Sequence, residues 1–155
     1  MYNHQPKDES CPLCIFAQGN ETEWNKRSDI VFEDEKIVAF ISPRWWINNP
    51  GHVIIIPKKH HENIYSIPDE LIAHVHINTK KAAIAVKETY YCDGITIIQH
   101  NEPTGDQDVW HYHVHIFPRY ANDNFYQNFY NRKFVSAEER KPYADKLKAY
   151  FDSKK

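Results

Sequence analysis

Three histidines alternate along one short segment of the chain, at positions 111, 113 and 115. Successive side chains of an extended strand point to opposite faces, so His111, His113 and His115 share one face. Their Cα atoms are then about 6.5 to 7 Å apart. Three imidazoles at this spacing can converge on one small ligand, while Tyr112 and Val114 on the other face can pack against a helix.

Three interpretations of this histidine cluster are open from the residues alone. The histidines can be half-exposed side chains on a sheet face, or ligands of a catalytic zinc ion that keeps an open water position. The third interpretation is nucleophilic catalysis by His113, because a neutral imidazole is a good nucleophile near pH 7. Attack on phosphorus gives a phosphoramidate that water can cleave. The flanking histidines can hold the tautomer, donate to phosphoryl oxygens or protonate the leaving group.

The segment around the cluster resembles a family motif. The run His-Tyr-His-Val-His-Ile-Phe at 111–117 is similar to the His-φ-His-φ-His-φ-φ motif that defines the histidine-triad (HIT) family. The segment Pro50 to His60 resembles that family's Pro-Gly-His, apolar strand and Pro-Lys-x-His segment, and the resemblance extends from about Cys11 to Tyr120. It implies a hydrolase or nucleotidyl transferase that attacks the α-phosphate of a nucleoside phosphoramidate or a dinucleoside polyphosphate.

The resemblance also implies a role for individual residues. His113 is the nucleophile that forms a covalent nucleotidyl-histidine intermediate, His115 stabilises the α-phosphate, and His52 orients the nucleophile. The related sugar-phosphate nucleotidyltransferases carry Gln at the third triad position, so His115 favours the hydrolase branch. No catalytic metal is required. The residues implied to contact substrate are Asn101, Gln107, Ser42 and Val109.

A Cys-x-x-Cys pair near the N-terminus points to a metal. Redox pairs of this spacing normally follow a strand, and nothing before Cys11 looks like one. Half of a zinc site needs two more ligands, and the chain has ten histidines. Some bacterial HIT proteins, which this pattern resembles, complete the site with the His after Pro-Lys-x and the first triad histidine. The ligands implied for a closed, structural zinc site are Cys11, Cys14, His60 and His111, with His61 as a neighbouring alternative to His60.

This zinc site also weighs against a three-histidine catalytic zinc, because only two triad histidines remain once His111 is a ligand elsewhere. A metal-dependent hydrolase that uses the triad as zinc ligands is nevertheless one alternative. A nucleotide-binding module without turnover is the other.

The sequence departs from the family pattern at the substrate. Ser42 stands where many members carry an Asp that holds the ribose hydroxyls, and a hydroxyl lacks the charge-assisted acceptance of a carboxylate. Glu102 and Asp106 add carboxylates to the loop, which would repel a polyanionic substrate. A ligand with fewer charges is therefore expected. Trp45 and Trp46 either stack on a base or pack at a loop or dimer interface.

The elements that position these residues follow from apolar periodicity. A short helical or turn segment is expected at 11–19, and a helix of about 20 residues follows Pro68. Ser136 to Phe151 reads as a C-terminal helix with a capping box. Strands are expected at 30–32, 37–41, 52–57, 94–99 and 110–117, the last ended by Pro118. The fold class is α+β, HIT-like, with a mainly antiparallel five-stranded sheet, one long helix and a C-terminal helix.

Length and composition set the broad class. A chain of 155 residues suits a single domain over 1–155, with a core of about 11–120 and an extension at 121–155. The net charge of −2 argues against a stable nucleic-acid partner. No apolar run reaches the roughly 20 residues of a membrane span, and the N-terminus lacks a secretory h-region. With three cysteines a disulfide framework is not expected. We expect a cytoplasmic enzyme, and the resemblance implies a homodimer.

Overall fold

The computed structural model describes residues 2–154 and contains a five-stranded sheet in the order β1-β2-β4-β6-β5. Every neighbouring pair in this sheet is antiparallel. The strands are β1 (Ile30–Glu33), β2 (Ile37–Ile41), β4 (Val53–Pro57), β5 (Gly94–Gln99) and β6 (Val114–Arg119). The helices are α1 (Pro12–Ala17), α2 (Asp69–Tyr90) and α3 (Ala137–Asp152), with 3-10 turns η1 (Arg27–Asp29) and η2 (Pro103–Gly105). The predicted α+β class, with its antiparallel sheet, long helix and C-terminal helix, is confirmed.

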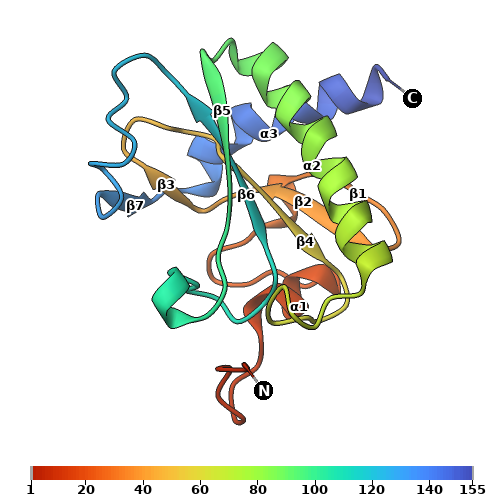
Figure 1. Ribbon diagram of the computed structural model, residues 1–155. Helices are drawn as coiled ribbons and strands as arrows, with labels where there is room; N and C mark the ends of the chain where they lie inside the picture. The colour runs from red at the N-terminus through yellow and green to blue at the C-terminus, as the bar shows by residue number, and fades with distance from the viewer. Residues whose placement is uncertain (1, 155) are drawn as a thin grey trace.

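Helices α2 and α3 cover one face of the sheet (Figure 1). In β4, Val53 and Ile55 belong to the core under these helices, whereas Ile54 and Ile56 pack on the opposite face with Phe16 of α1. Because both faces are covered, all five residues of β4 are buried, which accounts for its continuous apolar run. The second face also carries His115 of β6, which lies opposite Ile54 of β4.

The two long helices begin where the sequence predicted. Pro68 precedes the first residue of α2, and Asp69 and Glu70 lie in its first turn, where carboxylates interact favourably with the helix dipole. At the start of α3, the Glu139 backbone N–H donates to Ser136 Oγ, and the Ser136 N–H donates to the Glu139 carboxylate. This reciprocal pair is the predicted capping box.

The last strand of the sheet differs from its prediction. It was expected over 110–117 and ended by Pro118, but β6 begins at Val114 and continues through Pro118 to Arg119. Pro118 is tolerated because β4 pairs with β6 only as far as Ile116, and on that side the Asn49 amide donates to the Pro118 carbonyl. His111 and His113 therefore precede the strand, in irregular backbone, and can turn to different neighbours.

A two-stranded sheet that the sequence did not predict joins the C-terminal extension to the loop after β2. Strands β3 (Arg44–Trp46) and β7 (Arg132–Phe134) pair antiparallel, with Arg44 opposite Phe134 and Trp46 opposite Arg132. Opposed residues share a face, so these four side chains point to one side of the small sheet. Trp45 points to the other side, where it is buried in the core against Tyr143 of α3.

Gly51, immediately before His52, lies in a position that admits only glycine. Its φ is +78°, and a Cβ atom there would lie 2.2 Å from the ring of Tyr143. The turn before β4 and helix α3 therefore fit closely together. Within residues 2–154, none of the helices has the length and apolarity needed to cross a bilayer.

Candidate active site

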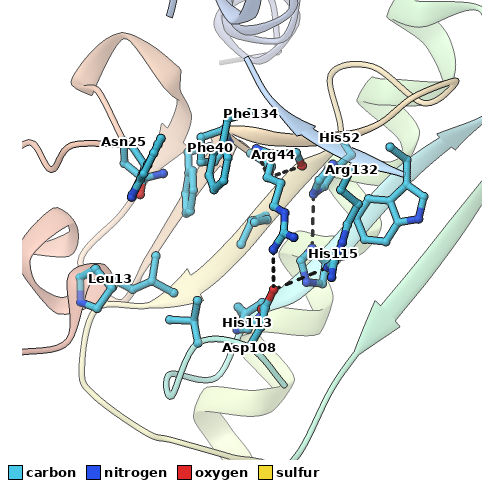
Figure 2. Close-up of a pocket in the computed structure, with 17 residues that line it drawn as sticks. Leu13, Asn25, Phe40, Arg44, His52, Asp108, His113, His115, Arg132 and Phe134 are labelled. Carbon is cyan, nitrogen blue, oxygen red and sulfur yellow. Dashed lines mark hydrogen bonds and ion pairs between the residues drawn. The ribbon is translucent and has the colours of Figure 1, made fainter. Parts of the chain in front are cut away.

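A cavity of about 340 Å³ opens on the sheet face that carries α1 (Figure 2). Its size is in the range of small-molecule sites. The predicted residues that line it are His113, His115, His52, Ser42 and Val109. Leu13, Phe40 and Ile54 form an apolar part of the wall, suited to a flat, weakly polar group.

His113 is held in one tautomer by the backbone. Its Nδ1 lies 2.6 Å from the carbonyl oxygen of His111, and a carbonyl can only accept, so Nδ1 carries the hydrogen. In the neutral ring, Nε2 then has a free lone pair. Burial lowers the pKa of His113 below its usual value, which favours this neutral form. The imidazole is thus in the state that a nucleophile requires.

His115 and His52 form a second pair at the same wall. His115 Nδ1 lies 3.3 Å from His52 Nε2, and the His115 ring lies 4.8 Å from that of His113 between centroids. Burial lowers the pKa of His52 to about 3 and the pKa of His115 well below its usual value. Both rings are therefore neutral near pH 7, and one of them donates to the other.

The tautomers of this pair follow from the buried His52 Nδ1, which has no hydrogen-bond partner among the described residues. A buried N–H without an acceptor is rarer than an acceptor without a donor. The favoured arrangement therefore leaves His52 Nδ1 unprotonated and lets His52 Nε2–H donate to His115 Nδ1. His115 then keeps its hydrogen on Nε2, where it can donate to a ligand in the cavity.

Ser42 and the two tryptophans have distinct environments. The Ser42 hydroxyl donates to the Arg44 carbonyl at 3.0 Å and accepts from the Arg44 N–H at 3.2 Å, so its hydrogen is already engaged. Trp46 lines the cavity but is only 3% exposed and packs against Phe117 and Phe125, whereas Trp45 packs in the main core. Stacking of a tryptophan on a base stays a prediction.

Asn101 and Gln107 are not among the residues that line the cavity. The Asn101 side chain accepts from the Ile64 N–H and donates to Gln99. The Gln107 amide donates to the carbonyls of Glu62 and Val109 and accepts from the Glu102 N–H. These amides support the loop between β5 and β6, and their predicted contact with substrate stays a prediction.

The cavity also contains charged residues that the sequence analysis did not single out. Arg44 and Arg132 extend from the small sheet toward Asp108 (Figure 2), and their Nη1 atoms lie 3.5 and 3.6 Å from Asp108 Oδ2. Glu102 and Asp106, the carboxylates expected to repel a polyanion, do not line the cavity. Because two arginines face one carboxylate, this part of the cavity wall carries a net positive charge.

Four predicted metal ligands lie together beside this cavity. The ligand atoms of Cys11, Cys14, His60 and His111 all lie within 4.8 Å of one another. The S···N distances between Cys11 and His111 and between Cys14 and His60 are both 3.3 Å. A tetrahedral zinc with Zn–S near 2.3 Å and Zn–N near 2.0 to 2.1 Å requires about 3.6 Å, so the four residues can hold such an ion.

The second nitrogen of His111 supports the same assignment. His111 Nε2 donates to the Pro57 carbonyl at 2.9 Å, which leaves Nδ1, the atom nearest both cysteine sulfurs, free to bind a metal. The Nδ1 atom of His61 faces the Ser66 carbonyl instead, so His60 rather than His61 belongs to the group. The three alternating histidines therefore separate, with His111 at the metal group and His113 and His115 in the cavity.

Comparison with known proteins agrees with this geometry. The HIT domain model matches residues 23–122, so the chain belongs to the HIT family. A HIT-like protein of Bartonella henselae is 30% identical, with a TM-score of 0.77 over 94% of this chain and 98% of that chain. A Zn-bound histidine triad family protein of Mycobacterium smegmatis is 25% identical, with a TM-score of 0.75, and the match covers 94% of this chain and 98% of that chain. A bis(5'-adenosyl)-triphosphatase of Dictyostelium discoideum is 26% identical over 84% of this chain and 90% of its own length.

Proposed function

We propose that this protein is a nucleotide hydrolase or nucleotidyl transferase in which His113 attacks the α-phosphorus of a nucleoside phosphoramidate or a dinucleoside polyphosphate. The observation that carries this proposal is the 2.6 Å contact of His113 Nδ1 with the His111 carbonyl, which leaves the Nε2 lone pair available in a cavity. Membership of the HIT family and the similarity to a triphosphatase support the same chemistry.

The reaction has two steps. In the first, a bond forms between His113 Nε2 and phosphorus as the bond from phosphorus to the leaving nitrogen or oxygen breaks, and the leaving group takes up a proton. In the second, water adds to phosphorus and the N–P bond breaks, which releases a nucleoside monophosphate, regenerates the free imidazole and returns to solvent a proton that balances the one taken up by the leaving group. In transfer, another acceptor replaces water.

His115 and His52 serve the same phosphorus in this proposal. A His115 Nε2–H directed into the cavity can donate to a phosphoryl oxygen and stabilise the charge that develops there. His52 acts as a positioning residue, because its contact with His115 Nδ1 fixes which nitrogen of His115 carries the hydrogen. Ser42, Val109, Asn101 and Gln107 are retained as proposed substrate-contact residues.

The test is turnover of adenosine phosphoramidate, followed as release of adenosine monophosphate. His113→Ala should lower kcat/KM by at least about a thousandfold, because loss of the nucleophile removes the covalent pathway. His74→Ala is the matched control, since His74 is a surface histidine that pairs with Asp34 on the helix-covered side. Equal activity of the His113→Ala and native proteins would contradict the proposal. No turnover by native protein across a panel of phosphoramidates and polyphosphates would favour a binding module.

We further propose that Cys11, Cys14, His60 and His111 bind a structural zinc ion. A bound zinc would anchor α1 and the segment before it to the catalytic segment. All four ligand positions come from the protein, which leaves no open position for substrate. Activity that survives chelation in protein that remains folded would reject the alternative of a catalytic three-histidine zinc. Reduced thiols as ligands are also compatible with the cytoplasmic location we propose.

We propose a homodimer formed through α2 and β5. Strand β5 is at the edge of the sheet, and Ile77, Ile84 and Ile97 on these two elements are 57%, 42% and 48% exposed. An open strand edge beside apolar side chains can pair with a second copy. Light scattering should give twice the chain mass, and Ile84→Glu should shift it toward the monomer. A native monomer at micromolar concentration would refute this part of the proposal.

A further inference from the structure

The small sheet β3–β7 gives the cavity two cations that the proposed reaction does not use. Arg44 and Arg132 lie on its inward face, on two strands whose sequence positions are far apart. Arg132 also lies outside the segment that matches the HIT domain. These arginines therefore give the cavity two positive charges in addition to the histidines of the proposed reaction.

Aromatic rings hold both guanidinium groups. The Arg132 guanidinium carbon lies 5.1 Å from the ring centroid of Trp46 and 5.2 Å from that of Phe129, and Arg44 lies 5.6 Å from the ring of Phe134. Such contacts fix the direction of a guanidinium and leave its N–H groups available. The Arg132 Nε atom is buried and has no hydrogen-bond partner in the described part of the chain.

Asp108 only partly balances these charges. Its contacts of 3.5 and 3.6 Å with the two arginines are longer than the 2.7 to 2.9 Å typical of a charge-assisted hydrogen bond. Its side chain is 45% exposed, so it can move away from the arginines. Burial lowers the pKa of Arg132 most, and repulsion by the nearby Arg44 lowers it further, while Asp108 and Asp106 act in the opposite direction. An anion between them would relieve that repulsion.

We propose that Arg44 and Arg132 form a second anion-binding subsite, so that the preferred substrate carries a further phosphate group besides the phosphorus that faces His113. Planar guanidinium groups with several free N–H donors suit the oxygens of a phosphate. Asp108 occupies the subsite when substrate is absent and is displaced by it. The inference rests on the proposed function only for the position of the attacked phosphorus. The sequence analysis expected a ligand with few charges because Glu102 and Asp106 would repel a polyanion. Since neither residue lines the cavity, the arginine subsite replaces that expectation.

The test is calorimetric binding of three probes to the native protein. They are adenosine monophosphate, the methylene-bridged analogue of adenosine diphosphate, and adenosine 3',5'-bisphosphate. The second probe carries its extra phosphate on the leaving-group side and the third carries it on the sugar, so the comparison also locates the substrate's second phosphate. We expect one of them to bind at least about tenfold more tightly than the monophosphate, which corresponds to about 1.4 kcal/mol.

Variants assign this preference to the arginines. Arg44→Gln and Arg132→Gln should each reduce the preference to within about twofold, and Asp108→Asn should strengthen it. Lys133→Gln is the matched control, because Lys133 follows Arg132 on β7 but lies on the opposite face of the small sheet from the two arginines, with its side chain 61% exposed. It should keep the native preference. Thermal melting identifies any variant that fails to fold.

The inference is overturned if neither doubly phosphorylated probe binds native protein more tightly than the monophosphate. It is also overturned if the preference survives in both folded arginine variants. Neither outcome depends on turnover, so a failure of His113 to form an adduct would leave this result standing. If His113 forms the adduct but neither doubly phosphorylated probe is preferred, the arginine subsite is refuted and the proposed reaction at His113 is not affected.

Discussion

The buried ion pair between Arg140 of α3 and Asp29 of η1 gives a sharp prediction about how the C-terminal extension is held. The Nε and Nη2 atoms of Arg140 lie 2.8 and 2.9 Å from the two carboxylate oxygens of Asp29, and the side chains are only 3% and 1% exposed. Arg140 also donates to the carbonyls of Trp24 and Val135. One guanidinium therefore satisfies acceptors from three separate segments.

Replacing Arg140 with Met removes these donors and leaves the Asp29 charge buried without its partner. Loss of one member of a buried pair typically lowers the free energy of unfolding by about 3 to 5 kcal/mol. At about 2 to 4 °C per kcal/mol for a chain of this size, the melting temperature should fall by about 6 to 20 °C. Because β7 immediately precedes α3, this loss should also loosen the position of Arg132.

Urea unfolding followed by circular dichroism measures this loss, and a double-mutant cycle tests its cause. Asp29→Asn combined with Arg140→Met should be more stable than Arg140→Met alone, since the unpaired charge is gone. The control is Lys141→Met, because Lys141 pairs with Asp145 on the exposed side of the same helix and its loss should have little effect. A loss below about 1 kcal/mol in Arg140→Met, or strictly additive changes in the cycle, would show that the Arg140–Asp29 pair does not hold the extension in this way.

Three further predictions concern pH, metal and backbone. Burial lowers the pKa of His52 to about 3 against about 6.5 unfolded, so the unfolded chain binds more protons between these values and stability falls as pH drops below 6.5. His52 should contribute about 2 kcal/mol to the fall in the free energy of unfolding between pH 6.5 and 5. If the free energy of unfolding of His52→Gln falls with pH as steeply as that of the native protein, this prediction is contradicted. Elemental analysis should find one zinc per chain, and chelation or Cys14→Ser should lower the melting temperature; unchanged melting would count against a structural ion. Gly51→Ala should destabilise by at least about 1 to 2 kcal/mol, from its positive φ and its overlap with Tyr143, and near-native urea unfolding would refute this.

The parts of the fold that were predictable are those with a sustained pattern. The apolar stripe of α2 repeats over 22 residues, and β4 is a continuous β-branched run, so both were located closely. Strands β3 and β7 have three residues each, too few for a periodicity, and they pair only through tertiary packing. The start of β6 was misplaced because alternating histidines look extended, whereas His111 and His113 turn toward different groups.

Within the candidate site, the histidines and cysteines were predictable because their residue types are uncommon and their spacing is regular. Arg44, Asp108 and Arg132 are of types that normally face solvent, so the residue types alone do not predict that they meet in a cavity. A weak signal existed in Arg-x-Trp at 44–46 and Arg-x-Phe at 132–134. In extended backbone, each of these places one cation and one ring on the same face.

Trapping the covalent intermediate on His113 tests the proposed reaction most directly. Native protein is mixed with adenosine phosphoramidate, quenched within the first turnover under conditions that preserve N–P bonds, digested and analysed by mass spectrometry. If His113 is the nucleophile, an adenylyl group should be found on the peptide that contains His113, absent from His113→Ala and present in His74→Ala. Product formation without any adduct on this peptide, or an adduct on another residue, would contradict it.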